Sequence, residues 1–163
     1  LWELGLPRRR LMEIGLTLGA DVPVFIYGRN AFAEGVGEAL QPVDIPPMWY
    51  VLLEPPVQVP TAAIFGAPEL KRDTPPMRAA DWADGIGIND LEAVACARFP
   101  VVAEHVRWLS RFGAARMTGS GACAFAAYAE RAAAEAVLAR MPAGMRGCVT
   151  AGLEKHPMLK LEN

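Results

Sequence analysis

The spacing of apolar residues near the start of the chain predicts a short helix. Within residues 8–16, Leu11, Ile14 and Leu16 stand among charged side chains, so a helix here would have one apolar face and a polar remainder. The three arginines at positions 8–10 are the longest basic run in the chain, and they fit the solvated face of that helix.

A β-hairpin is expected next. Residues 22–27 form an uninterrupted apolar run, which we interpret as a strand, and residues 31–34 alternate in polarity as a second strand would. Residues 28–30, Gly-Arg-Asn, are turn-forming. We therefore predict a hairpin over residues 24–34.

A change in composition divides the chain near residue 47. Residues 42–47 include prolines, which cannot donate to a sheet ladder and favour extended linkers. Residues 49–53 then form a continuous apolar run, which predicts a buried central strand. We expect one domain to end at residue 47 and a second to cover residues 48–163.

The pattern beyond this strand predicts an α+β sandwich, with helices on one face of an antiparallel sheet. Expected helices cover residues 62–65, 90–99, 101–112 and 130–141, and expected strands cover residues 114–118, 122–128 and 146–150. In the last helix we expect Ala133, Val137 and Met141 to share the apolar face, because they recur at four-residue steps.

Two of these helices have capping signals. Thr61 is expected to cap the helix that begins at residue 62. Asn89 and Glu92 stand at the first and fourth positions of a capping box before the helix at residue 90. Between these helices, residues 66–88 are rich in Pro, Gly and Asp and predict a long loop.

Composition narrows the classes of function. Of the 163 residues, 53% are hydrophobic and 21% are charged, which is a globular composition, and the net charge of -2 does not indicate a nucleic-acid partner. No apolar run approaches the ~20 residues of a membrane span, so we expect no membrane partner. The three widely spaced cysteines do not predict a disulfide framework or a zinc site, and they fit a reducing cytoplasm.

Asp21 is the first candidate for chemistry, and the residues around it leave two interpretations open. It stands between a glycine and an apolar run, where an aspartate commonly caps a turn by accepting bonds from nearby backbone N–H groups. Alternatively, it is a carboxylate held at a strand end, facing a cleft, where it accepts a proton from a substrate hydroxyl.

A second candidate is the glycine loop Gly119-Ser120-Gly121. Its glycines allow backbone N–H groups to approach an anion, but they also suit a plain hairpin turn. No G-K-[ST] follows, so it is not a Walker A loop, and it lacks the context of a nucleophile elbow. Cys123 is interpreted as a small buried hydrophobe, and Phe65 as either a core residue or a platform for stacking a nucleobase.

Taken in order, five segments resemble those of the diphosphocytidyl-methylerythritol kinases, within the galactokinase, homoserine kinase and mevalonate kinase superfamily. The segments are G-A-D-V-P-V-F at 19–25, A-F-A-E-G-V-G-E at 31–38, Pro60-Thr61 with Phe65, N-D-L-E at 89–92, and T-G-S-G-A at 118–122. They occur in the family's order and with similar spacing over nearly the whole chain.

The resemblance implies a fold and an activity. The fold would be a ferredoxin-like C-terminal domain over residues 48–163, preceded by the tail of a ribosomal-protein-S5-like N-terminal domain. The activity would be ATP- and Mg²⁺-dependent phosphorylation of the C2 hydroxyl of 4-diphosphocytidyl-2-C-methyl-D-erythritol in the bacterial cytoplasm. Asp21 falls on the family's catalytic aspartate, Phe65 on a residue that stacks on cytosine with Thr61 beside it, and residues 119–121 on the loop that closes over the reacting groups.

The chain departs from the family pattern at its start. It opens at Leu1 without an initiator Met, and it contains no P-x-x-x-G-L-G-G-G-S-S pattern of the ATP phosphate loop. We therefore expect a fragment that lacks the N-terminal half, where ATP and Mg²⁺ are mostly held, and that has no useful kinase activity alone. No metal ligands are assigned, and the oligomeric state is left open, a homodimer included.

Two alternatives stay open on the sequence. One is a non-catalytic small-molecule-binding α+β domain, in which the glycine loop is a turn and Asp21 is a cap. The other is a sister kinase that acts on homoserine or mevalonate.

Overall fold

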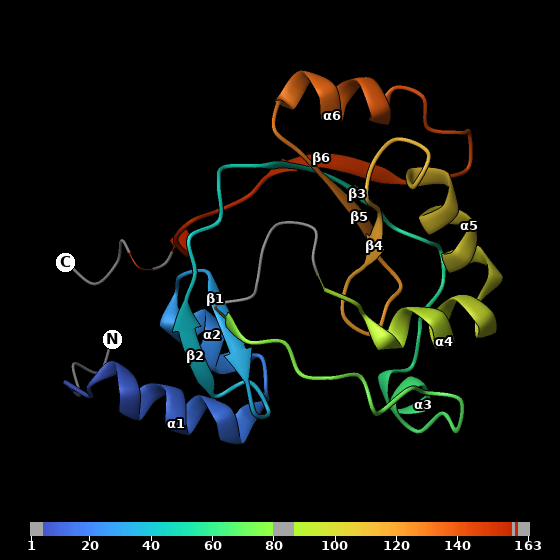
Figure 1. Ribbon diagram of the computed structural model, residues 1–163. Coiled ribbons are helices and arrows are strands. Elements are labelled where there is room, and N and C mark those ends of the chain that lie inside the picture. Colours follow the sequence, from blue (N-terminus) through green and yellow to red (C-terminus); the bar gives the residue numbers. More distant parts are fainter. Residues whose placement is uncertain (1–4, 80–86, 158, 160–163) are drawn as a thin grey trace. The chain divides into compact units, whose positions relative to one another are not determined.

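The computed structural model describes residues 5–79, 87–157 and 159, and the chain divides into two units (Figure 1). The first unit comprises Leu1–Pro46 together with the residues from Leu153 onward, and the second is Pro47–Gly152. The sequence placed residues 48–163 in a single domain, whereas the residues from Leu153 onward cluster with the first unit.

Two helices open the first unit, α1 (Arg8–Leu18) and α2 (Val22–Tyr27), and they pack on each other. Gly15 of α1 lies at their contact, because an added Cβ would stand 2.7 Å from Ile26 Cδ1. The helix expected over residues 8–16 is confirmed and continues to Leu18. The strand expected over residues 22–27 is wrong, since this segment is helical.

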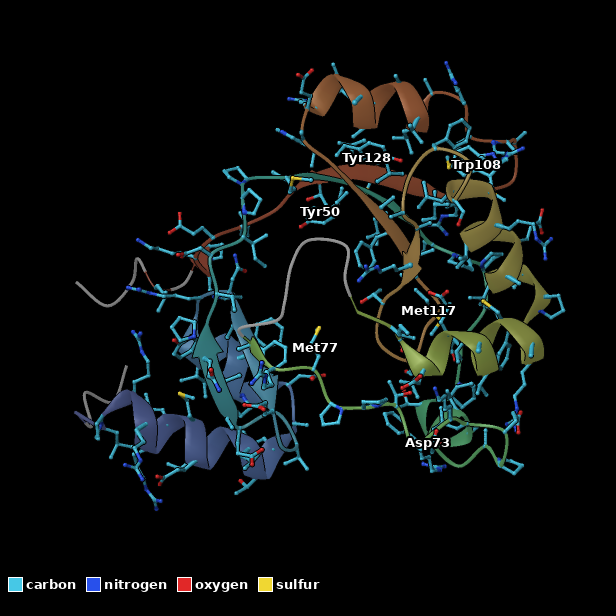
Figure 2. All side chains as sticks on the ribbon, in the orientation of Figure 1. Tyr50, Asp73, Met77, Trp108, Met117 and Tyr128 are labelled. Atoms are coloured by element: carbon cyan, nitrogen blue, oxygen red, sulfur yellow. The ribbon has the colours of Figure 1, made fainter. Side chains whose placement is uncertain are left out.

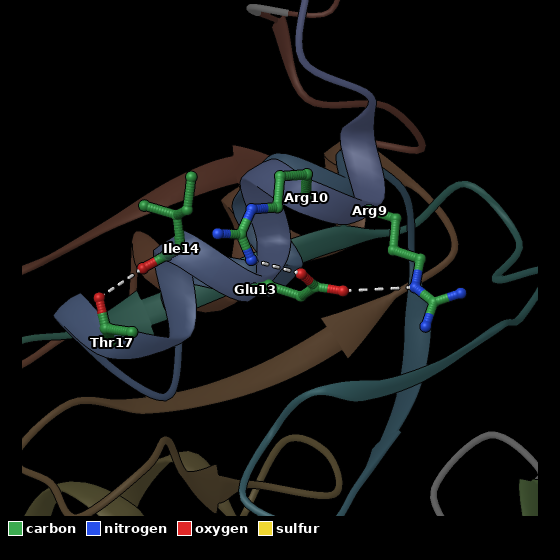
Figure 3. A network of polar contacts seen from close by, with 5 residues as sticks. All are labelled: Arg9, Arg10, Glu13, Ile14 and Thr17. Carbon is green, nitrogen blue, oxygen red and sulfur yellow. Dashed lines mark hydrogen bonds and ion pairs between the residues drawn. The ribbon is translucent and has the colours of Figure 1, made fainter.

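The outer face of α1 is polar, as its arginines predict. Glu13 accepts a hydrogen bond from Arg10 Nη1 at 2.9 Å and also pairs with Arg9, 3.4 Å from its Nε (Figure 3). The bond from Arg10 is the main reason why the pKa of Glu13 lies below its ordinary value. All three side chains are largely exposed, so these pairs contribute little to stability.

The hairpin of the first unit lies further along the chain than predicted. Strand β1 (Ala31–Glu34) pairs antiparallel with β2 (Ala39–Pro42), with Glu34 opposite Ala39. The turn between them contains Gly35 and Gly37 at positive φ angles of 70° and 111°. The hairpin predicted over residues 24–34 is therefore wrong, because its first strand belongs to α2.

Lys155 and His156 attach to the end of α2. The backbone N–H of His156 donates to Gly28 O at 2.9 Å, and Arg29 and Lys155 form an antiparallel bridge. Gly28 has a positive φ of 72° and no room for a side chain, because an added Cβ would lie 2.6 Å from Leu159 Cδ1.

The second unit is built on a four-stranded antiparallel sheet with the order β4-β5-β3-β6. The strands are β3 (Trp49–Leu53), β4 (Arg116–Met117), β5 (Ala124–Tyr128) and β6 (Gly147–Ala151), and the helices are α3 (Thr61–Phe65), α4 (Asp90–Arg98), α5 (Pro100–Leu109) and α6 (Arg131–Leu138). Helices connect β3 to β4 and β5 to β6, and each pair of strands encloses one other strand. This is the split βαβ arrangement of ferredoxin-like folds, and the expected α+β class is confirmed.

The main core of this unit lies between one face of the sheet and helices α5 and α6 (Figure 1). Its buried members are Val51, Leu53, Trp108, Leu109, Ala124, Ala126, Ala134 and Val137. On α6 the buried alanine is Ala134, whereas Ala133 is exposed. Val137 is buried and Met141 packs against the core as expected, so only Ala133 is wrong. Ala134 takes its place because, at 3.6 residues per turn, residues i and i+3 share the buried face here.

A second cluster of buried residues ties α3, α4 and α5 to β4, and it contains Ile64, Ala67, Leu70, Val94, Ala95, Val102 and Met117. Met117 is 2% exposed and leads directly into the glycine loop (Figure 2). This cluster therefore fixes the helices and the strand around the segments that the sequence singled out. Among the described residues, no helix is long and apolar enough to cross a membrane.

Candidate functional site

The glycine loop joins β4 to β5 in a tight turn. Thr118 N donates to Cys123 O at 2.9 Å, and Gly121 N donates to Thr118 O at 3.0 Å. Gly119 and Gly121 have positive φ angles of 55° and 100°, which glycine adopts at little cost. A Cβ on Gly121 would lie 3.0 Å from Met117 Sδ and 3.4 Å from Val59 Cγ2, so the loop is packed closely at this point.

The start of α4 holds the entrance of this loop. Asn89 Nδ2 donates to Met117 O at 3.0 Å and to Gly119 O at 2.8 Å, while Asn89 Oδ1 accepts from Leu91 N. Glu92 Oε2 accepts from Met117 N at 2.6 Å. The expected N-cap at Asn89 is confirmed, but Glu92 binds the strand that leads into the loop and not the backbone of Asn89.

Thr61 contacts the loop from α3. Its Oγ1 lies 2.8 Å from Ser120 Oγ, within hydrogen-bond distance. Thr61 is the first residue of α3 and no side chain caps this helix, so the capping role expected for Thr61 is wrong. Its hydroxyl instead connects two segments that are 59 residues apart in sequence.

Phe65 lies at the other end of the same short helix. It is 51% exposed, so it is not a core residue, and one of its two sequence interpretations is excluded. Two arginines hold this end of α3. Arg72 Nη2 donates to Phe65 O at 2.6 Å, and Arg98 Nη1 donates to Ala63 O at 3.1 Å. These hydrogen bonds to the backbone of α3 hold in place the five-residue helix that carries the Phe65 ring.

Arg98 is itself oriented by an ion pair with Glu69. The Nε atom of Arg98 lies 2.7 Å from Glu69 Oε1. The hydrogen bond from Arg98 lowers the pKa of Glu69 from its ordinary value of 4.5. The charged form of Glu69 therefore favours the arrangement in which Arg98 reaches α3.

Asp21 lies in the first unit, immediately before α2. It is exposed, and its side chain makes no capping hydrogen bond to that helix. The position at a strand end is wrong, because α2 is a helix, and the cap interpretation is not supported. Gly37 of the hairpin turn lies against the carbonyl of Ala20, where an added Cβ would be 2.6 Å from the oxygen. The hairpin therefore supports the backbone next to Asp21.

Other groups that the sequence raised contribute less. Cys123 is half-buried, and burial, together with the charge of Glu54, raises the pKa of its thiol. A raised pKa disfavours the thiolate, which agrees with a packing role. Within the described ranges, no three His, Cys, Asp or Glu side chains gather in a way that could hold a metal ion.

Of the predicted site residues, the structure brings Thr61 and Ser120 into contact and places Phe65 on the helix that Thr61 begins. Asp21 belongs to the other unit, so its relation to these residues remains a prediction. The sequence did not identify Asn89 and Glu92 as loop contacts. Their signal was present in the N-D-L-E segment, but it was interpreted only as a helix start.

Comparisons with known proteins agree with the motifs. Residues 72–147 match the family model described as GHMP kinases C terminal. The chain is 58% identical, over 99% of its length and 59% of the relative, to 4-diphosphocytidyl-2-C-methyl-D-erythritol kinase of Dechloromonas aromatica (strain RCB). It is also 58% identical to the protein of the same name in Thiobacillus denitrificans (strain ATCC 25259 / T1), over 97% of its length and 57% of that protein.

Among solved structures, the chain resembles a crystal structure of 4-(cytidine 5′-diphospho)-2C-methyl-D-erythritol kinase. The TM-score is 0.62 at 32% sequence identity, covering 87% of this chain and 56% of the other. The chain thus spans between half and three fifths of the length of the relatives it matches.

Proposed function

We propose that this chain, which matches the GHMP kinases C terminal model over residues 72–147 and is 58% identical to the Dechloromonas kinase, is part of an enzyme that phosphorylates the C2 hydroxyl of 4-diphosphocytidyl-2-C-methyl-D-erythritol with ATP. One observation supports this proposal above the others. The hydrogen bond between Thr61 and Ser120 joins α3, which presents the exposed ring of Phe65, to the glycine loop. A base-stacking surface and an anion-binding loop in direct contact suit a substrate that carries a base at one end and reacts at the other.

Asp21 is assigned to the acceptor hydroxyl in this proposal. The hydroxyl oxygen forms a bond to the γ-phosphorus of ATP, the bond from that phosphorus to the β–γ bridging oxygen breaks, and ADP leaves. The Asp21 carboxylate orients the hydroxyl and takes its proton. Its exposure and the lack of a capping bond leave the carboxylate able to do so.

The glycine loop is assigned to the phosphate oxygens. The backbone N–H of Gly121 donates to Thr118 O. We therefore assign ligand binding to the backbone N–H groups of Gly119 and Ser120. Backbone N–H groups fixed in a tight turn stabilise negative charge without reorganisation during the reaction. This role needs a loop held in one conformation, which the contacts from α3 and α4 supply.

Phe65 is assigned to the cytosine ring. Stacking on an aromatic side chain is worth about 1–3 kcal/mol per base. The stacking contact is remote from the reacting hydroxyl, so its binding energy serves to position that hydroxyl for the reaction.

ATP and Mg²⁺ complete the proposed reaction. A magnesium ion bound to the ATP phosphates neutralises their charge during transfer. Because the described residues gather no metal-binding cluster, we assign no residue of this chain to the ion, and we expect its ligands elsewhere in the enzyme. A small-molecule substrate and a location in the bacterial cytoplasm belong to the same proposal.

A hybrid enzyme tests this function. The 163 residues would replace the matching stretch of the Dechloromonas relative, which supplies the remainder of the enzyme. We expect the hybrid to convert 4-diphosphocytidyl-2-C-methyl-D-erythritol to a product with one added phosphate on C2, as seen by ³¹P NMR. A folded hybrid that consumes no ATP with this substrate contradicts the proposal.

The same hybrid separates the sister kinases. Homoserine and mevalonate lack a base for Phe65, so we expect neither to be phosphorylated at a comparable kcat/KM. Faster turnover of either one would replace the cytidine-bearing substrate in this proposal.

A further inference from the structure

The side chain of Asn89 connects helix α4 and the glycine loop at one point. Its Oδ1 accepts from Leu91 N at 3.1 Å and so caps the helix. Its Nδ2 donates both hydrogens, to Met117 O at 3.0 Å and to Gly119 O at 2.8 Å. One amide therefore satisfies a helix end and two carbonyls at the entrance of the loop.

This arrangement requires an amide and not only a capping residue. Ser, Thr and Asp cap helices about as well as Asn does. None of these three, however, combines an acceptor for Leu91 N with two donors for the facing carbonyls. The orientation of the amide is also fixed, because the opposite flip would place its oxygen against two carbonyl oxygens.

Glu92 holds the same strand from the first turn of the helix. Its carboxylate accepts from Met117 N at 2.6 Å, while Asn89 binds Met117 O. Both backbone groups of Met117 are therefore bound by side chains from the first turn of α4. Met117 is 2% exposed and both bonds are partly buried, so they are less exposed to competing water than surface bonds.

We propose that Asn89 and Glu92 are positioning residues that set the conformation of the glycine loop for phosphoryl transfer. They act through the loop backbone and do not touch the substrate. The part of this inference that concerns catalysis rests on the proposed function, while the part that concerns loop conformation does not. The competing explanation is that Asn89 only caps α4.

The substitution Asn89→Asp separates these two explanations. Aspartate keeps the acceptor for Leu91 N, and its charge is favourable at a helix N-terminus, so α4 should stay intact. It replaces the NH₂ group by an oxygen that faces Met117 O and Gly119 O, so the loop should loosen. Asn30→Asp is the matched control, because Asn30 lies in the first unit.

The first measurement is amide hydrogen exchange of the full 163-residue chain by NMR. The reporters are the bonded amides of Thr118 and Gly121 around the loop, and that of Phe99 at the C-terminal cap of α4, which donates to Ala95 O. We expect Asn89→Asp to speed exchange of the two loop amides about tenfold, which corresponds to losing more than one net hydrogen bond. The Phe99 amide should be unchanged, and Asn30→Asp should change none of the three.

The second measurement is steady-state kinetics of the hybrid enzyme with the cytidine-bearing substrate. A misplaced loop should lower kcat by about 10- to 100-fold and should change KM by less than threefold, because Phe65 is untouched. Glu92→Ala should act in the same direction. Glu92→Gln should recover most of kcat, since its side-chain oxygen still accepts from Met117 N.

The outcomes are distinct. Faster loop exchange with an intact α4 and a reduced kcat supports the proposal. Unchanged loop exchange in Asn89→Asp, or equal loss of protection in the loop and α4, overturns it and leaves Asn89 as a cap. If the hybrid with Asn89 intact is inactive, the proposed function fails, and the exchange measurement still decides whether Asn89 sets the loop.

Discussion

The hydroxyls of Thr61 and Ser120 lie 2.8 Å apart and join α3 to the glycine loop. The sequence around either residue does not predict this contact. Their contact links the loop to the helix that carries Phe65, four residues after Thr61. Binding of a base at Phe65 and of phosphate at the loop should therefore be energetically linked.

The double substitution of Thr61 and Ser120 measures this link. Thr61→Val removes the hydroxyl at nearly constant volume, and we expect it to weaken binding of cytidine 5′-diphosphate by about 1 kcal/mol, or about fivefold. Calorimetric titration of the full chain gives this number. Ser120→Ala should add little to Thr61→Val, because both changes remove one bond. Fully additive effects would mean that the hydroxyls do not interact, and Thr150→Val, in β6, is the matched control.

Substitutions of Phe65 test base stacking. Because the ring is 51% exposed, Phe65→Ala should leave the unfolding free energy nearly unchanged. We expect it to raise the Kd for cytidine 5′-diphosphate by about 5- to 150-fold, from a loss of about 1–3 kcal/mol. Phe65→Trp should bind as well as the parent, whereas Phe65→Leu, which is apolar without a π-face, should behave like alanine. Equal affinity of the leucine and tryptophan variants would exclude stacking.

Alanine substitutions in the glycine loop should differ in cost. At Gly119, with a φ of 55° and no atom within 4 Å of an added Cβ, alanine should cost about 1 kcal/mol of unfolding free energy. At Gly121, φ is 100° and the Cβ would lie 3.0 Å from Met117 Sδ, so the cost should reach about 2–3 kcal/mol. Urea unfolding of the two variants checks the order. A Gly119→Ala variant that is the less stable of the two would contradict the loop geometry.

The Glu69–Arg98 ion pair predicts a pH dependence. The folded-state pKa of Glu69 is lowered, chiefly by the hydrogen bond from Arg98, so its contribution to stability is present above its ordinary value of 4.5. The contribution is lost as pH falls through the lowered pKa. The difference in unfolding free energy between the parent and Glu69→Gln should therefore narrow below about pH 4.5. Denaturant unfolding from pH 3 to 7 measures it, and a constant difference would contradict the pairing.

Sequence pattern predicted the elements of the second unit well, because its strands and helices have clear periodicity and α4 has a clear cap. Strand β3 begins and ends at the predicted residues, and Asn89 caps α4 as expected. The pattern failed at residues 22–27, an apolar run that has no period. Pro23 near its start and Gly28, which is left-handed at its end, are helix signals that the apolar run concealed.

The sequence predicted which residues belong to the candidate site but not the contacts between them. The residue pattern indicates only local roles at helix starts for Thr61, Asn89 and Glu92, and the resemblance places Thr61 beside Phe65 without a contact to the loop. Their partners in β4 and the loop are 25 to 59 residues away in sequence. Such pairings depend on how β4 lies beside α3 and α4, which tertiary packing determines.

The isolated chain is a further check on the account. Because it retains Phe65, we expect it to bind cytidine compounds. It has no glycine-serine-rich phosphate loop in its sequence, so we expect it to turn over no ATP alone. A coupled ADP-release assay at saturating ATP and substrate measures this. Turnover at the rate of the hybrid enzyme would mean that the residues of this chain suffice for ATP binding.

The most direct measurement compares Asp21→Asn with Asp44→Asn in the hybrid enzyme. Both carboxylates are exposed and belong to the first unit, but only Asp21 is assigned to the acceptor hydroxyl. We predict that Asp21→Asn lowers kcat by at least about 100-fold, within the range expected for loss of a general base, with unchanged unfolding midpoint and substrate affinity. Asp44→Asn should keep the parent kcat. A kcat for Asp21→Asn equal to that of Asp44→Asn would contradict the account.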